Sequence, residues 1–393
     1  MDQPRSLVNK KYCTDILKKL VRINSVNPSL VPGAPGEAEI SECIAEAMQQ
    51  IGLTTTMSEV IENRPNVIGI HKGARNGPAL LLNGHTDTVG IEGMKIEPLE
   101  PVLKDGLIYG RGSHDMKGGI ASILGATKAV IDSGQELGGD LIVAAVCDEE
   151  YASIGTEALV KHIRADAAIV TESTELQILV AHKGFAWIDV ETLGLAAHGS
   201  QWEVGVDAIT MMGRVLGSVE KLQKDLSSKR HALVGKPSVH ASLIKGGKEL
   251  STYPDYCKLQ IERRMIPGET RSDVDEEMTE MMKSLSNEDP KFKARKNMFF
   301  VRDPMEVSPE ERLCQVLSKC TAEVTGTQPL FIGGGGWLDT QIMTSRGIPS
   351  VAFGPTGGGA HATTEYIQLD SVYNVARVLE ATIPIFCETK DHP

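Results

Sequence analysis

Short runs of apolar residues that end in polar or charged residues form the main pattern of this chain. Examples are residues 80–82, 141–146, 167–170 and 351–353. Runs that are apolar at every position are typical of strands buried on both faces, as in a parallel sheet covered by helices. Segments with helical spacing, such as 156–163, alternate with these runs. We therefore predict an α/β fold whose mostly parallel sheet carries helices on both faces.

The pattern changes near Ala181. Residues 185–190, 239–243 and 257–264 alternate between apolar and polar positions, which indicates half-exposed antiparallel strands. A long amphipathic segment at 206–222 lies between them and predicts a helix. Because strands and helices are not in βαβ order here, this part of the chain is expected to form an α+β domain of its own.

The length of 393 residues exceeds what one ordinary core accommodates. Since α/β character resumes after the α+β segment, we predict an insertion. Residues 1–182 and 299–393 form the expected catalytic domain, and residues 183–298 form an inserted lid or dimerisation domain. The strands near 185–190 and 239–243 are expected to be sheet edges, which favours a homodimer through the inserted domain.

Composition excludes several classes of partner. A net charge of −12 argues against binding to nucleic acid. No apolar run approaches the roughly 20 residues that a bilayer requires, and residues 1–11 are too polar for a signal peptide. The seven cysteines are scattered, odd in number and free of a CxxC pair, which favours a reducing cytoplasmic location.

Histidines and carboxylates follow the apolar runs. In open α/β sheets, ligands bind outside the carboxyl ends of the strands, so these side chains are candidates for a metal site. One zinc ion needs three protein ligands, and this set is large enough for two ions with one bridging carboxylate and one base. Nitrogen and oxygen ligands suit zinc or cobalt, with manganese as a further candidate. The set comprises His85, Asp87, Asp115, Glu149, Glu150, Glu172 and His361.

An ordered set of short motifs spans nearly the whole chain. The motifs are residues 84–89 (GHTDTV), 110–119 (GRGSHDMKGG), 148–150 (DEE) with Gly155, Glu172, 197–200 (AHGS), Gly354-Pro355, His361 and Glu365. Each motif alone is weak, but together they resemble the M20 metallopeptidases and amidohydrolases, especially the branch of acetylornithine deacetylase and succinyl-diaminopimelate desuccinylase.

The resemblance implies a division of metal ligands. His85 and Glu172 would hold one zinc ion, Glu150 and His361 would hold the other, and Asp115 would bridge the two. Two zinc ions per chain are therefore expected, with cobalt or manganese as substitutes.

The resemblance also implies two catalytic roles beside the ligands. Glu149 would be the general base, and Asp87 would orient the imidazole of His85. Taken alone, the acidic triplet at 148–150 is better explained as a solvated turn. Its place after a buried strand, together with the other candidate ligands, favours the catalytic interpretation.

Three residues of the expected insertion are assigned to substrate by the resemblance. His198 would polarise the scissile carbonyl, from its own or a neighbouring subunit, and Arg264 would bind a substrate carboxylate. Ser251 stands where related proteins often have a substrate-contacting asparagine. The alternatives are a capping or core role for His198 and a solvent-exposed side chain for Arg264.

These inferences predict a di-zinc amidohydrolase that removes the acyl group from a small N-acyl amino acid or a related carboxylate-bearing amide. A dipeptidase or carboxypeptidase of the same family is the first alternative. A metal-dependent binding protein without turnover is the second, and the presence of Glu149 argues against it.

Overall fold

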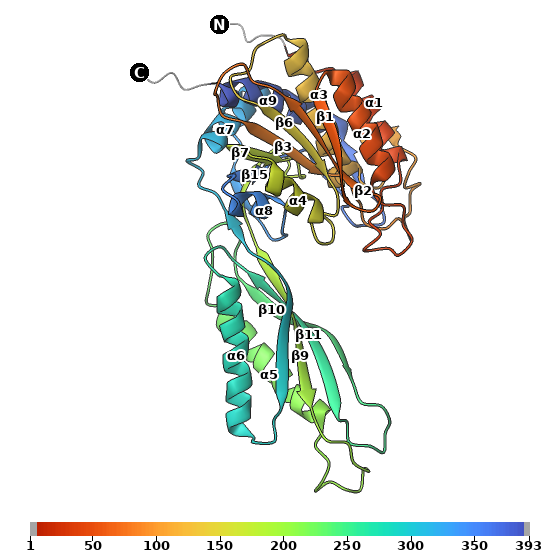
Figure 1. The fold of residues 1–393 in the computed structure, drawn as a ribbon, viewed down its shortest axis with the longest axis vertical. Helices are drawn as coiled ribbons and strands as arrows, with labels where there is room; N and C mark the ends of the chain where they lie inside the picture. Colours follow the sequence, from red (N-terminus) through yellow and green to blue (C-terminus); the bar gives the residue numbers. More distant parts are fainter. Residues whose placement is uncertain (1–5, 389–393) are drawn as a thin grey trace. The chain divides into compact units, whose positions relative to one another are not determined.

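The computed structural model describes residues 6–388, and the chain divides into two compact units (Figure 1). The first unit contains the chain up to Val180, residues Val307–Ile332 and the chain from Leu338 onward. The second unit contains Ala181–Glu306 and Gly333–Trp337.

The first unit is built on a mainly parallel sheet. Its strands follow the order β1-β2-β6-β3-β7-β15-β8, and neighbouring pairs among β6, β3, β7 and β15 are parallel. The bounds are β1 (Thr54–Ile61), β2 (Arg64–His71), β3 (Leu80–His85), β6 (Leu141–Val146), β7 (Ala167–Val170), β8 (Ile178–His182) and β15 (Ser350–Ala352). The four parallel strands coincide with the apolar runs of the sequence and are buried at every position. The predicted mostly parallel sheet is therefore confirmed.

Helices cover both faces of this sheet. In Figure 1, α4 and α8 lie in front of the strands, whereas α3 and α9 lie behind them. Helices α1 and α7 join the second layer, since α1 packs on α3 and α7 packs on α9, and α2 packs on β1 and β2. The bounds are α1 (Lys10–Arg22), α2 (Ala38–Ile51), α3 (Gly118–Asp132), α4 (Ile154–His162), α7 (Arg312–Thr325), α8 (Thr340–Ser345) and α9 (Leu369–Cys387).

A small second sheet in this unit brings two distant loops together. Its order is β16-β17-β5-β4, with β4 (Val102–Lys104), β5 (Leu107–Tyr109), β16 (Gly357–Gly358) and β17 (Tyr366–Gln368). The antiparallel pairing of β5 with β17 places the segment before Asp115 beside the segment after His361. Asp115 itself lies in a kinked turn, Ser113–Lys117, immediately before α3, and its own backbone is not helical.

The second unit is a four-stranded antiparallel sheet with two helices. Its bounds are β9 (Gly184–Leu193), β10 (Ser238–Gly246), β11 (Tyr256–Met265), β12 (Ala294–Arg302), α5 (Ala208–Leu226) and α6 (Arg271–Glu288). The core of the unit is formed by alternate residues of β9 and β11, such as Ile188 and Ile261, packed against buried residues of α5 and α6. Two short strands, β13 (Met305–Glu306) and β14 (Phe331–Gly334), pair with β8.

Two sequence expectations about this unit need correction. Strand β9 was expected to be an edge, but the order β10-β11-β9-β12 places it inside the sheet and makes β10 and β12 the edges. The unit also extends to Glu306 rather than ending at residue 298. The reason is that β12 pairs with β9 over residues 294–302, although its basic, half-exposed sequence gives little strand signal.

Among residues 6–388, none of the helices combines the length and the hydropathy of a membrane span.

The N-terminus of α6 provides a test of the second unit. The Thr270 side chain accepts a hydrogen bond from the backbone N–H of Asp273, and the Asp273 side chain accepts one from the Thr270 backbone, forming a capping box. We expect Thr270→Ala to lower the free energy of unfolding of this unit by about 1 kcal/mol. All three tryptophans, Trp187, Trp202 and Trp337, belong to the second unit, so urea unfolding followed by tryptophan fluorescence reports on it directly.

Thr279→Ala, on the exposed face of the same helix, is the matched control. It should leave the transition within about 0.5 kcal/mol of the wild type, because no cap is lost. Equal effects of the two substitutions would contradict the capping role of Thr270.

Candidate metal centre

Four neighbouring parallel strands place the candidate ligands at one edge of the sheet. His85 is the last residue of β3, Glu150 follows β6, and Glu172 follows β7. His361 lies in the loop between β16 and β17, which follows β15. Because the carboxyl ends of parallel strands meet at the same edge, residues far apart in sequence become neighbours here.

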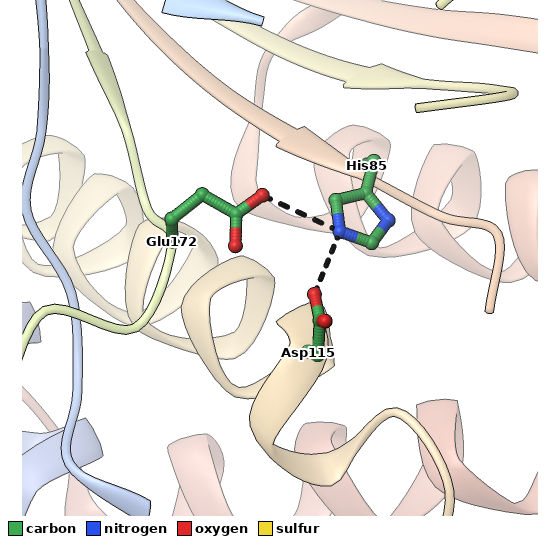
Figure 2. Close-up of side chains that lie close together, drawn as sticks. All are labelled: His85, Asp115 and Glu172. Carbon is green, nitrogen blue, oxygen red and sulfur yellow. Dashed lines mark hydrogen bonds and ion pairs between the residues drawn. The ribbon is translucent and has the colours of Figure 1, made fainter. Parts of the chain in front are cut away.

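His85, Asp115 and Glu172 form the first group of side chains. Figure 2 shows one ring nitrogen of His85 facing the carboxylates of both Asp115 and Glu172. Its Nε2 atom lies 3.0 Å from Asp115 Oδ1 and 3.4 Å from Glu172 Oε1. One ligand atom from each residue falls within 4.8 Å of the other two, which suits a shared ion.

Asp115, Glu150 and His361 form the second group. His361 Nε2 lies 2.9 Å from Glu150 Oε2 and 3.3 Å from Asp115 Oδ2. Asp115 therefore takes part in both groups, with Oδ1 directed to the first and Oδ2 to the second. This is the arrangement expected of a carboxylate that bridges two ions.

The charges around the two groups favour a cation. Burial raises the pKa of Glu172 and that of Glu149 above their ordinary values, and it raises the pKa of Glu150 to about 7. Glu150 Oε1 is buried and has no hydrogen-bond partner among the described residues. A bound cation would satisfy this oxygen and offset the cost of gathering carboxylates away from water.

The donor atoms identify the kind of ion that fits. Both groups offer imidazole nitrogens and carboxylate oxygens, and neither contains a cysteine. The seven cysteines of the sequence are all buried and free elsewhere in the fold. Such a donor set fits divalent zinc, cobalt or manganese.

The chain matches the sequence profile of a known protein family. The profile of peptidase family M20/M25/M40 matches residues 81–384, which is more than half of the chain. The chain belongs to this family. Its members are metallopeptidases and related hydrolases, so the chain is a hydrolase of C–N amide bonds, and the resemblance drawn from the motifs is confirmed.

Individual relatives carry names of amide-cleaving enzymes. The chain is 27% identical over 396 residues to N-formyl-4-amino-5-aminomethyl-2-methylpyrimidine deformylase of Bacillus subtilis, covering 91% of this chain and 92% of the relative. It is 29% identical over 329 residues to acetylornithine deacetylase of Myxococcus xanthus, covering 82% and 84%. Among solved structures, aminopeptidase PepT of Bacillus cereus matches with a TM-score of 0.79 and 20% identity, covering 97% of this chain and 100% of that one. This last likeness supports the fold of an M20 peptidase.

Asp87 lies beside the His85 imidazole. His85 Nδ1 lies 3.0 Å from the backbone oxygen of Asp87 and 3.6 Å from Oδ1 of its carboxylate. The carboxylate also accepts the backbone N–H groups of Glu149 and Glu150, each at 3.1 Å. Asp87 therefore lies against both the imidazole and the acidic turn, and its role in orienting His85 stays a prediction.

Glu365 supports the loop that carries the bridging carboxylate. It is fully buried, and its Oε1 accepts the backbone N–H groups of His114 at 2.9 Å and Asp115 at 3.0 Å. Its Oε2 accepts from Arg111 Nη1 at 2.7 Å and from the Gly112 N–H. The sequence marked Glu365 as a motif residue without a role, and the structure assigns it the support of this M20 loop.

The three residues expected to contact substrate lie in the second unit. His198 is exposed, and its Nδ1 lies 2.8 Å from Ser200 Oγ. Ser251 is exposed as well, and its backbone oxygen accepts from the Gly199 N–H at 2.7 Å. The loops of His198 and Ser251 are therefore adjacent, with His198 bridged to Thr252.

Arg264 lies on the face of β11 that the alternation predicted. It is half-buried, its Nε donates to Glu262 Oε1 at 2.7 Å, and its guanidinium stacks 5.1 Å from the ring centre of Phe185. Its neighbour Arg263 points to the opposite face and is fully buried with Glu269 and Glu277. Arg264 is thus a fixed arginine on the open face of the sheet rather than a freely solvated one.

Proposed function

We propose that this M20 hydrolase is a di-zinc deacylase of an N-acyl amino acid or a related small amide that carries a carboxylate. The observation that supports this most directly is the pair of three-residue groups that share Asp115. The names of the relatives, a deformylase and a deacetylase, favour removal of a small acyl group over cleavage of a dipeptide.

The residues present fit two divalent ions. His85 and Glu172 would hold one ion, Glu150 and His361 the other, and Asp115 both. When bound, such ions supply Lewis-acid stabilisation of negative charge and lower the pKa of water. Cobalt or manganese would substitute for zinc, because the donor atoms suit all three metals.

Glu149 is the proposed base. Its side chain is set among Glu172, Glu150 and Asp339, and burial together with these charges raises its pKa, which favours proton uptake. Glu149 takes the proton of the attacking water and then passes it to the leaving nitrogen. In this proposal Glu149 transfers the proton, and its neighbour Glu150 binds a metal ion.

The second unit supplies the substrate contacts in this proposal. Arg264 retains guanidinium donors beyond its bond to Glu262, and these would bind the substrate carboxylate. His198 would donate a hydrogen bond to the carbonyl oxygen as negative charge develops there, and Ser251 would contact the substrate from the adjacent loop.

We also propose a cytoplasmic homodimer that forms through the second unit. Strand β10 is an edge of its sheet, and Leu243 and Ile244 on it are 65% and 55% exposed. An edge with exposed apolar side chains is suited to pairing with a second copy.

The metal requirement gives the first test of this function. Exhaustive chelation should abolish hydrolysis of amides, and zinc or cobalt should restore it at about two ions per chain, because Asp115 belongs to two ligand groups. The assay uses N-formyl, N-acetyl and N-succinyl amino acids beside dipeptides. Full activity after chelation would overturn the metal proposal, and turnover of dipeptides alone would replace the deacylase by a dipeptidase.

The two neighbouring glutamates give the second test. Glu149→Ala should keep both metals and lose nearly all turnover, whereas Glu150→Ala should lose one metal. The reason is that Glu150 Oε2 lies 2.9 Å from the candidate ligand His361, while Glu149 belongs to neither ligand group. Metal analysis and kcat are measured on the same preparations. Loss of a metal in Glu149→Ala with an active Glu150→Ala would exchange the two roles.

His198 gives the third test. His198→Ala should leave folding and metal content unchanged and lower kcat strongly, since an oxyanion donor acts mainly in the transition state. Its exposure and its local contacts to Ser200 make a folding defect unexpected. An unchanged kcat would remove His198 from the mechanism.

A mixture of His198→Ala with Glu149→Ala then determines which subunit His198 serves. Recovered activity in the mixed dimer means that it acts across the interface. No recovery, with subunit exchange demonstrated, places it in the chain that also carries its metals.

A further inference from the structure

The turn that carries Glu149 and Glu150 is held by carboxylates from distant parts of the chain. Three consecutive backbone N–H groups, those of Asp148, Glu149 and Glu150, each donate to such a carboxylate. The Asp148 N–H donates to Glu37 Oε1 at 3.2 Å. The N–H groups of Glu149 and Glu150 donate to Oδ1 and Oδ2 of Asp87, at 3.1 Å each. Each acceptor belongs to another element of the fold, so the turn is fixed from outside.

Asp148 itself has an unusual backbone conformation. Its φ of +69° lies in the left-handed region, which is costly for a residue with a Cβ atom and persists where surrounding contacts fix it. Its carboxylate provides such contacts, because Oδ1 lies 2.8 Å from Arg64 Nη1 and accepts from Asn27 Nδ2 at 3.1 Å. Asn27 Nδ2 also donates to Asp87 Oδ2 at 2.8 Å, which joins the two supports of the turn.

Arg64 and Glu37 lie behind this turn as a buried ion pair. Arg64 Nε and Nη2 donate to the two oxygens of Glu37 at 2.8 Å and 2.5 Å, in a fork of two parallel bonds. Glu37 is fully buried and Arg64 is 3% exposed, so neither can contact substrate in this unit. Burial raises the pKa of Glu37 despite the bonds from Arg64, which indicates that this charge is placed here at a cost.

We propose that Arg64 and Glu37 are positioning residues for the reaction, acting through Asp148 to set the orientations of Glu149 and Glu150. This inference rests on the roles of base and ligand proposed for those two glutamates. A rotation of the backbone at Asp148 would move both carboxyl groups at once. Proton transfer and metal binding tolerate only displacements well below 1 Å. A small shift of this turn therefore lowers turnover without removing any catalytic group.

A buried pair that only stabilises the fold would give a different pattern from a positioning pair. Loss of Arg64 alone leaves two buried carboxylates, Glu37 and Asp148, without it, whereas the double variant Arg64→Met/Glu37→Gln leaves only Asp148. The double variant therefore recovers part of the stability that loss of Arg64 costs. For a positioning pair, kcat does not recover with it, because Asp148 still lacks its bond to Arg64.

The experiment compares Arg64→Lys, Glu37→Gln and the double variant with the wild type as full-length, zinc-loaded protein. Arg64→Lys keeps the charge but loses the fork. We expect kcat to fall about 10- to 100-fold in all three variants while KM stays within about twofold, because no substrate contact is changed. Zinc affinity, measured on the metal-free proteins by competition with a chromophoric chelator, should fall for one of two ions, the one that Glu150 binds.

Glu277→Gln is the matched control for Glu37→Gln. Glu277 belongs to another arginine–carboxylate cluster, around the fully buried Arg263 in the second unit. Its substitution should lower the thermal midpoint and leave kcat and zinc affinity at wild-type values.

Three results would overturn the inference. They are a wild-type kcat in folded Arg64→Lys, a kcat that recovers together with stability in the double variant, and an equal loss of kcat in Glu277→Gln. If the wild-type protein hydrolyses no amide with zinc or cobalt, it is the proposed function that fails. The positioning role is then tested by zinc affinity alone. Unchanged affinity for both ions in all three variants contradicts it.

Discussion

Repulsion between carboxylates is the constraint on which the rest of this structure depends. The fold gathers Asp115, Glu149, Glu150 and Glu172 at the carboxyl edge of a buried parallel sheet, where water cannot screen them well. Hydrogen bonds from His361 and His85 hold the pKa of Asp115 below its ordinary value despite burial, but the pKa values of the glutamates are raised. Two imidazoles therefore do not balance this cluster. Divalent cations would, and the raised pKa of Glu149 supports the base role proposed for it.

A site of this kind requires that its acidic side chains be held against their mutual repulsion. Much of the support comes from hydrogen bonds to backbone N–H groups of the loops that carry the candidate ligands. Glu365 accepts two of them and fixes the loop of Asp115, while Asp87 accepts two and fixes the turn of Glu149 and Glu150. In both cases a buried carboxylate anchors the main chain that carries other carboxylates of the candidate metal centre. The Arg64–Glu37 pair adds a third support behind this layer.

The sequence predicted most of this centre because its elements obey local rules. Fully apolar runs identified β3, β6, β7 and β15, and the polar residues after them supplied the ligands. The supporting residues were not found, since Glu37 and Arg64 are separated in sequence from the turn that they hold by more than 80 residues and have no periodic signal. Asp87 was identified beside His85, but its bonds to the backbone N–H groups of Glu149 and Glu150 were not, because sequence spacing does not reveal bonds to the backbone of another strand's loop. Strand β12 was missed for a related reason, namely that its pairing with β9 compensates for a basic, half-exposed sequence.

Relatives with differently named activities share this fold, so the fold alone does not determine the substrate. Relatives named as a deformylase and a deacetylase, and a solved structure named as an aminopeptidase, share this architecture over nearly the whole chain. A fold that serves acyl groups and peptides alike does not itself select between them. Under the proposed function, the metal groups would act on the amide that all these substrates contain, so selection would come from side chains that contact the rest of the substrate. Arg264, held by Glu262 and stacked on Phe185, is the proposed recognition group, because its remaining guanidinium donors would suit a carboxylate.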